Sequence, residues 1–181
     1  MAQQRTILTV GHGPLGRADL SLLLQTHGVQ TLVDVRRFPK SRHNADVSSE
    51  SLVDWLPAAG IAYHWDERLG GRRRIPAGYQ AVDVWWQVEA FRAYAAHTRT
   101  AEFQDALANL LSLAASTTVA VMCSETVWWR CHRRLIADVL VLGHGVPVEH
   151  LVPSQPARAH LPSSGARVDS PGLLVWDSTE D

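Results

Sequence analysis

The chain has 181 residues, of which 46% are hydrophobic and 19% are charged, and its formal net charge is −1. This length and composition predict one globular domain with a full core, and the near-zero charge excludes a global basic field that would recruit extended duplex nucleic acid. The chain has no apolar run of membrane-spanning length, no signal-like N-terminus and only two cysteines, which predicts a cytoplasmic protein with reduced thiols and no membrane partner.

Hydrophobic periodicity predicts that strands and helices alternate along the chain. Strands are expected over residues 6–10, 31–35, 61–65, 119–122 and 147–152. Helices are expected over residues 19–27, 49–59, 84–96, 101–115 and 135–142. Ser48 or Ser49 is the expected cap of the second helix, and Pro57 limits its end. The alternation predicts an α/β fold, in which a mostly parallel sheet carries helices on both faces, a three-layer arrangement that is loosely rhodanese-like or Rossmann-like.

Residues 1–152 are expected to form this single α/β domain. Residues 153–181 are rich in Pro, Ser, Gly and Ala, which predicts a mostly irregular C-terminal tail. Within the tail, the apolar residues 173–176 are the segment expected to dock back on the domain.

The most informative segment runs over residues 118–142. A buried strand ends on Cys123, a polar and aromatic loop follows, and a helix begins near the basic residue Arg133. Ligands bind at the carboxyl ends of strands in open α/β sheets, and a helix start with basic residues favours a thiolate over a thiol. We therefore expect a depressed pKa and a nucleophilic role for Cys123. The alternative is that Cys123 is a small buried hydrophobic residue.

The turn after the first strand, at residues 11–16, matches the dinucleotide-binding pattern G-x-G-x-x-G. Asp34 ends the second strand about where a ribose-binding acid would lie. A single match is weak, and Pro14 favours a tight turn that simply starts a helix. His12 is of interest in this turn, because it lies at the carboxyl end of a strand, on the same rim as Cys123.

Arginines are concentrated in two loops. Arg36 and Arg37 follow Asp34 at the exit of the second strand, and residues 72–74 are three arginines that follow two glycines. Lys40 is the only lysine, so nearly all positive charge comes from the side chain best suited to bidentate contacts with carboxylate or phosphate. The two loops predict an anion-binding role; the alternative is ordinary solvated basic loops with Asp34 paired to one arginine.

Cys123, Glu125, Cys131 and His132 lie close together in the sequence. They could bind zinc, but they lack the paired C-x-x-C spacing of structural zinc sites, so no metal is predicted. Cys131 is either a resolving cysteine for Cys123 or a packed residue of the first helical turn. Trp128, in the same loop, either forms the wall of a pocket for a planar ligand or packs in the core.

Four ordered motifs distinguish the chain: TVGH at residues 9–12, LVDVRRFPKS at 32–41, LGG at 69–71, and CSE with CHR at 123–125 and 131–133. This set resembles the bacterial and archaeal family catalogued as domain of unknown function 488, over about residues 7–152. The resemblance implies an α/β domain without an assigned activity. The chain departs from the family pattern at Gly13, where serine is usual, and in the loop at residues 127–129.

A looser similarity to rhodanese-like domains rests on two features. Asp34, Val35 and Arg36 form a D-V-R near the end of an early strand, and Cys123 opens a loop that runs from a later strand into a helix. In rhodanese-like domains such a loop cradles an anion. The spacing differs here, since Arg130 lies seven residues after Cys123.

These features predict a thiol-dependent enzyme, a transferase or hydrolase, that acts on a small anionic or nucleotide-like substrate with Cys123 at a strand-to-helix loop. The expected catalytic residues are Cys123, His12, Glu125 and His132. The residues expected to bind the substrate or its anionic group are Asp34, Arg36, Arg37, Arg72, Arg73, Arg130, Arg133 and Trp128. The rival hypothesis is a non-catalytic nucleotide or nucleic-acid binding module with an arginine and tryptophan pocket. The sequence identifies no cofactor.

Overall fold

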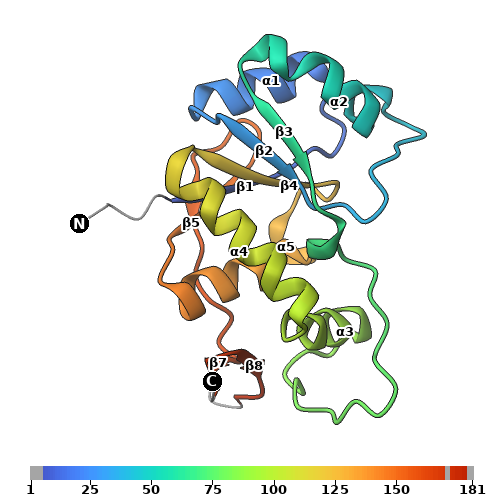
Figure 1. Cartoon of the computed structure of the whole chain (residues 1–181), viewed down its shortest axis with the longest axis vertical. Helices are drawn as coiled ribbons and strands as arrows, with labels where there is room; N and C mark the ends of the chain where they lie inside the picture. Colours follow the sequence, from blue (N-terminus) through green and yellow to red (C-terminus); the bar gives the residue numbers. More distant parts are fainter. Residues whose placement is uncertain (1–5, 170–171, 179–181) are drawn as a thin grey trace.

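A six-stranded sheet forms the centre of the molecule, with the strand order β3-β2-β4-β1-β5-β6 (Figure 1). The structure is a computed structural model that describes residues 6–169 and 172–178. Strands β1 to β5 run parallel, and β6 pairs with β5 in the antiparallel direction. The strands of this sheet are β1 (Ile7–Gly11), β2 (Thr31–Asp34), β3 (Ala62–Trp65), β4 (Val119–Cys123), β5 (Val148–Leu151) and β6 (Arg158–Ala159).

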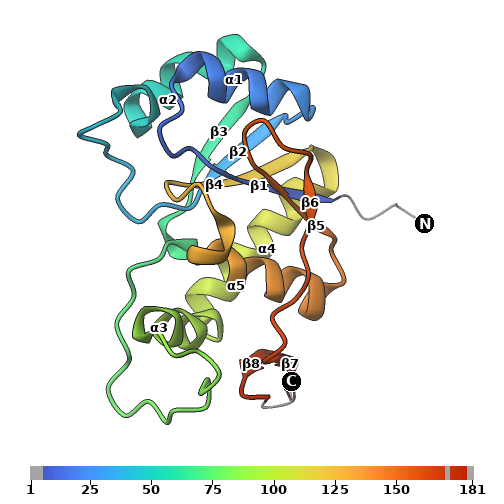
Figure 2. The ribbon, with the colours of Figure 1, turned by 180° about the vertical axis from the view of Figure 1, so that it is seen from behind.

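Helices cover both faces of the sheet, so the fold has three layers, as predicted (Figures 1 and 2). One face carries α1 (Arg17–Thr26) and α2 (Ser49–Trp55). The other face carries α3 (Glu89–Thr98), α4 (Ala101–Ser116) and α5 (Arg133–Asp138), and α5 continues into a π-helical turn at Val139–Gly143. Short 3-10 turns occur at Ala45–Val47, Pro57–Ala59, Glu67–Leu69 and Trp128–Arg130.

The alternation of side chains along each strand divides the core into two clusters. In β4, Val119 and Val121 pack with α3, α4 and α5, whereas Ala120 and Met122 pack with α1 and α2. All four side chains are fully buried, as expected for a strand that is covered on both faces. The predicted continuous apolar run of this strand is therefore confirmed.

Two helices, α2 and α3, are shorter than the helices that the sequence patterns predict. Ser48 caps α2 by accepting from the Ser51 amide at 3.2 Å, and Pro57 begins a separate 3-10 turn after the helix ends. Helix α3 begins at Glu89, not at residue 84. The preceding segment is held by the tail instead, because the Trp85 amide donates to the Trp176 carbonyl at 3.0 Å.

The C-terminal segment is more regular than its composition predicts. It contains β6 and a two-stranded sheet of β7 (Ala166–Val168) and β8 (Leu174–Trp176). The predicted docking is confirmed, since Leu174, Val175 and Trp176 are buried, and Trp176 belongs to the same core cluster as α4 and α5. Among the helices of the described residues, none combines the length and apolar character that crossing a membrane requires.

Candidate functional site

The strand register brings the predicted site residues to one edge of the sheet. Gly11 lies opposite Cys123, and Asp34 lies opposite Met122, so β1, β2 and β4 end at the same level. The pairing continues into the loops, because the His12 amide donates to the Cys123 carbonyl at 3.0 Å. This edge is the carboxyl edge, where ligands bind in open α/β folds.

Gly11 allows the loop after β4 to approach β1 closely. A Cβ atom at this position would overlap the Glu125 carbonyl oxygen and lie 2.8 Å from the Arg133 side chain. Gly13 has a left-handed φ of 46°, and a Cβ there would overlap the Thr126 hydroxyl. These glycines therefore serve loop packing, and the turn does not form a phosphate-binding fingerprint.

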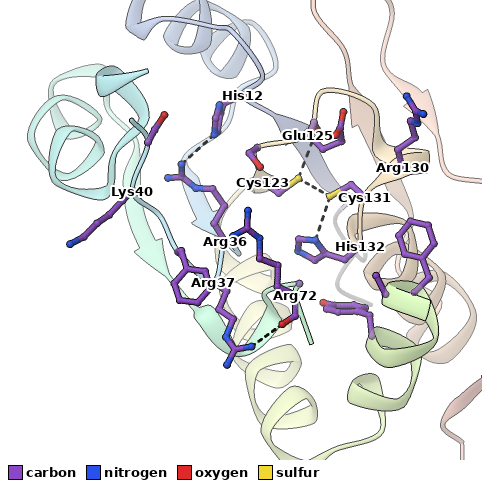
Figure 3. Close-up of a pocket in the computed structure, with 17 residues that line it drawn as sticks. His12, Arg36, Arg37, Lys40, Arg72, Cys123, Glu125, Arg130, Cys131 and His132 are labelled. Atoms are coloured by element: carbon purple, nitrogen blue, oxygen red, sulfur yellow. Dashed lines mark hydrogen bonds between the residues drawn. The ribbon is translucent and has the colours of Figure 1, made fainter. Parts of the chain in front are cut away.

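Two free thiols lie together at the inner end of the site (Figure 3). The sulfur atoms of Cys123 and Cys131 are 2.8 Å apart, and the two residues are only 2% and 6% exposed. Cys123 ends β4, and Cys131 comes immediately after the 3-10 turn at Trp128–Arg130. The loop thus brings the two cysteines together although eight positions separate them in the chain.

Arg133 is fully buried behind the thiol pair. Its Nε donates to the Cys123 sulfur at 3.0 Å, one terminal nitrogen donates to the Thr9 hydroxyl at 3.1 Å, and the other donates to the Glu125 carbonyl. No carboxylate among the described residues forms an ion pair with it. A buried guanidinium has lost its hydration, and a nearby negative charge offsets that loss. The thiol pair is the group beside Arg133 that can carry this negative charge.

The two thiols ionise as a coupled pair. Burial raises the pKa of Cys131, but the hydrogen bond from Cys123, the His132 ring and the Arg133 charge together hold this pKa well below its usual value. Burial, followed by the hydrogen bond and charge of Cys131, raises the pKa of Cys123 well above its usual value. The direction at Cys123 is therefore opposite to the expected depression of its pKa, because burial and the neighbouring Cys131 outweigh the Arg133 charge.

Arg36 is held rigidly at the opposite side of the site. Its guanidinium makes a bidentate contact with the buried Asp34 carboxylate, at 2.9 and 2.6 Å, and a third bond to the Val47 carbonyl at 2.7 Å. The Tyr63 hydroxyl completes the contacts of Asp34 at 2.8 Å. Asp34 therefore positions Arg36, and its carboxylate is not free to bind a ribose or any other ligand.

His12 is neutral in this arrangement. Its Nδ1 contacts the Gly13 carbonyl at 2.9 Å, and its Nε2 lies 3.2 Å from Arg36. A carbonyl only accepts and a guanidinium only donates, so the proton is on Nδ1. Burial is the largest effect and lowers the pKa of His12; Arg36 and Arg133 lower it further, whereas the Gly13 bond and the Asp34 charge raise it by less than the combined lowering.

A cavity of about 320 Å³ opens above the thiols (Figure 3). Its cationic lining is Arg36, Arg37, Lys40, Arg72 and Arg130, and its other polar lining includes His12, Ser41, Ser124, Glu125 and His132. The Arg72 side chain reaches into the cavity, whereas Lys40 and Arg130 lie at its edge. Glu125 is the one carboxylate in this lining. Asp34 already pairs with Arg36, so the excess of positive charge comes from Arg37, Lys40, Arg72 and Arg130.

Four residues predicted to bind the substrate do not line this cavity. They are Asp34, Arg73, Trp128 and Arg133. Arg73 bends back onto its own loop, where it donates to the carbonyls of Gly70 and Glu67 at 3.0 and 2.7 Å. Trp128 stacks on the His150 ring at a centroid distance of 4.1 Å. Partners within the protein occupy Asp34 and Arg73, and the half-buried Trp128 ring is used in its contact with His150.

His132 lies between the cavity and the core. Its Nδ1 is 3.5 Å from the Cys131 sulfur, and the Tyr94 ring packs against it at a centroid distance of 5.0 Å. Gly71 permits this placement, since a Cβ there would lie 2.9 Å from Nδ1. The Nε2 atom is buried and has no hydrogen-bond partner among the described residues. His132 is thus positioned beside the Cys131 sulfur, which the adjacency of the two residues in the sequence did not indicate.

The family described as "Domain of unknown function DUF488" matches residues 18–140, which is more than half of the chain. The chain belongs to this family. No curated protein and no solved structure matches the chain. The DUF488 match includes the thiol pair, Arg36, Arg72 and Arg133, whereas His12 and the C-terminal segment lie outside it.

A buried polar chain, which the sequence patterns did not indicate, connects the DUF488 region to the C-terminal segment. Arg133 donates to Thr9, the Thr9 hydroxyl lies 2.7 Å from His150 Nδ1, and His150 Nε2 lies 2.9 Å from His160. His160 in turn contacts the Asp138 carboxylate at 2.7 Å. The Arg133 guanidinium and the Asp138 carboxylate, a buried cation and a buried anion, are thus connected through Thr9, His150 and His160.

This polar chain predicts that stability falls in mild acid. Burial, together with the charges of His160 and Arg133, lowers the pKa of His150 to about 3. Unfolding lets this ring bind a proton below its ordinary pKa of about 6.5, so His150 favours the unfolded state increasingly as the pH falls from about 6.5 toward 3. Its contribution between pH 8 and pH 5 is about 2 kcal/mol. Urea unfolding at both pH values measures the difference.

The His150→Gln variant is the comparison for this prediction. It removes the titrating ring, so its unfolding free energy should change less between pH 8 and pH 5, whatever its absolute stability. The His27→Gln variant, which changes a residue outside the polar chain, should keep the wild-type pH dependence. Equal pH dependence in the wild type and in His150→Gln would contradict the assignment.

Proposed function

We propose that this DUF488 protein is a thiol-dependent enzyme that acts on a small anionic substrate and uses Cys123, at its strand-to-helix loop, as one member of the reacting thiol pair. The observation that carries the proposal is the position of the pair. Two thiols whose sulfur atoms are 2.8 Å apart lie at the inner end of a cavity lined by four arginines and a lysine. A thiolate is the nucleophilic form of cysteine, and a depressed pKa makes it available at neutral pH.

The cavity favours a small substrate with one or more anionic groups. Its volume, about 320 Å³, is at the lower end of the range for ligand pockets. Arg36 is fixed by Asp34, Val47 and His12, which leave one of its five N–H donors for an anion, and this donor loses little conformational freedom on binding. Arg72 and Arg37 are more exposed and add positive charge at the entrance. Arginine contacts carboxylate and phosphate with paired hydrogen bonds, so either group suits this lining.

Two features support a loose likeness to rhodanese-like domains. The D-V-R at the end of β2 places Arg36 in the cavity, and Cys123 follows β4, which lies beside β2 in the sheet. Cys131 differs from the single-cysteine arrangement that this likeness suggests, because its sulfur contacts that of Cys123. The likeness therefore supports anion binding near a thiol. It does not indicate the reaction type, which we infer from the pair of cysteines instead.

The rival hypothesis of a binding module depended on a tryptophan wall for base stacking. Trp128 is stacked on the buried His150 ring and lies outside the cavity lining. The aromatic side chains that do line the cavity are Phe38, Phe91 and Tyr94, and the Tyr94 hydroxyl is engaged with the Leu69 carbonyl at 2.6 Å. The contacts of Trp128 therefore favour the enzyme over the stacking module.

Anion binding provides the first test. Sulfate, phosphate and small dicarboxylates are expected to raise the melting temperature and to slow alkylation of the thiol pair by iodoacetamide at pH 7. At 100 times its dissociation constant, a ligand adds roughly 2.7 kcal/mol, which corresponds to about 5–10 °C for a chain of this size. Differential scanning fluorimetry and peptide mapping measure the two effects.

Arg72→Gln and Arg74→Gln form a matched pair of variants for this test. Both remove one charge from the same loop, but only Arg72 lines the cavity. The proposal requires a reduced thermal shift in Arg72→Gln and a wild-type shift in Arg74→Gln. An anion screen without any thermal shift, or an equal loss in both variants, would show that the cavity is not an anion site.

A further inference from the structure

The two sulfurs are close enough to form a bond with each other. They are 2.8 Å apart as free thiols, and a disulfide bond needs about 2.05 Å, so a small side-chain movement is sufficient. Both cysteines line the same cavity, hence one substrate can reach the pair. Cys131 carries the depressed pKa, and Cys123 keeps a proton that its hydrogen bond directs toward Cys131. This arrangement suits an attacking thiol and a resolving thiol.

We propose that the thiol pair reduces small disulfides that carry carboxylate groups. This inference rests on the proposed thiol-dependent function and specifies its reaction and its substrate class. An enzyme that carries sulfur or an acyl group on one cysteine must keep that intermediate away from other thiols. Here the second sulfur would attack such an intermediate at once, because it is held at contact distance. The pair is therefore suited to a reaction in which the attack of the second cysteine on the intermediate releases the product.

The substrate class follows from the thiols at the inner end of the cavity and from the arginines in its lining. A disulfide presents an electrophilic sulfur to the thiolate at the inner end, while carboxylates on its substituents match Arg36 and Arg72 in the lining. Cysteine-containing small thiols have this combination of sulfur and carboxylate. A neutral disulfide of similar size would lack the contacts with arginine and would react more slowly.

The reaction balances in two steps. The Cys131 thiolate attacks one sulfur of the substrate R–S–S–R; a Cys131–S–R bond forms, the substrate S–S bond breaks, and the released R–S⁻ takes a proton from solvent. Cys123 then attacks the Cys131 sulfur; a Cys123–Cys131 disulfide forms, the Cys131–S–R bond breaks, and the second R–S⁻ takes the proton that Cys123 gives up. The two cysteines lose two electrons, and the substrate becomes two thiols. An external dithiol must then reduce the enzyme disulfide.

Oxidised glutathione is a suitable probe, and 2-hydroxyethyl disulfide is its neutral control. The reduced protein is mixed with each probe without oxygen, and the released thiol and the modified peptides are quantified. The wild type should release two thiols per protein and form the Cys123–Cys131 disulfide. Oxidised glutathione should react about tenfold faster than the neutral probe at low salt, since steering by charge accelerates association by roughly this factor or more.

Variants separate the two steps. Cys123→Ser should release one thiol and retain one glutathione on Cys131, whereas Cys131→Ser should react at least about tenfold more slowly. Arg72→Gln should reduce the preference for the anionic probe, and Arg74→Gln should leave it unchanged. A stable mixed disulfide in the wild type, or equal rates for both probes, would overturn the inference. If the disulfide experiments give these results but iodoacetamide still labels Cys131 quickly and anions still slow that labelling, the disulfide reduction is wrong and the proposed thiol-dependent function is still supported.

Discussion

Replacing Arg133 with methionine is expected to slow alkylation of the thiol pair at pH 7 by about 100-fold. Methionine has a similar length but no charge, so Cys131 loses the buried cation that helps to keep it ionised. Each unit of pKa increase lowers the thiolate fraction about tenfold, and loss of a buried charge is expected to raise the pKa by about two units. The rate of iodoacetamide labelling between pH 5 and pH 10, with peptide mapping, gives the pKa directly.

Arg134→Met is the matched control for this experiment. It makes the same substitution one residue later in α5, but Arg134 lies over the Trp85 and Trp86 rings, at 5.3 and 5.1 Å, away from the thiols. Its pH profile of labelling should equal that of the wild type. In Arg133→Lys the pKa of the thiol pair should be intermediate. Lysine keeps the charge but lacks the branched guanidinium, which donates to Thr9 and Cys123 at the same time. A wild-type pH profile in a folded Arg133→Met protein would exclude Arg133 as the group that ionises the pair.

Gly11→Ala should destabilise the protein by about 3 kcal/mol or more. The added methyl group would overlap the Glu125 carbonyl, and it would lie 2.8 Å from the Arg133 side chain, so either β1 or the loop after β4 must move. The closer contact, with the Glu125 carbonyl, is to backbone, which cannot yield as a flexible side chain does. Urea unfolding measures the loss, and labelling of the thiols should change in the same variant because the loop positions Arg133.

Gly143→Ala provides the comparison for Gly11→Ala. Its added methyl group would lie 3.4 Å from the Leu174 side chain, an ordinary contact, and its backbone does not require glycine. The expected change is below about 1 kcal/mol, in the range of the difference in helix propensity between the two residues. A similar loss of stability in both variants would mean that the close approach at Gly11 is not the cause.

Local sequence patterns were sufficient to predict the layered fold and the strand end at which the thiol pair lies. The apolar run of β4, the helical spacing in α4 and the strand-loop-helix order around Cys123 all depend on neighbouring residues, which the sequence displays directly. The position of Cys123 at a strand end also placed it at the carboxyl edge without further information, since parallel strands align their ends there. The D-V-R motif predicted Arg36 in the cavity for the same reason.

Only the tertiary structure decided which charges face the thiols and which thiol ionises. Arg73 and Arg72 are adjacent in sequence, yet one bends onto its own loop and the other enters the cavity. The Thr9–His150 contact joins residues 141 positions apart, so no local spacing could indicate the polar chain. The pKa of Cys131 is lowered because the loop places its sulfur against Cys123, His132 and the charge of Arg133, which together outweigh the effect of burial. These residues are close in the sequence, but only the folded loop sets how their side chains meet. Periodicity specifies which face a side chain occupies, whereas ionisation depends on the particular groups that meet on that face.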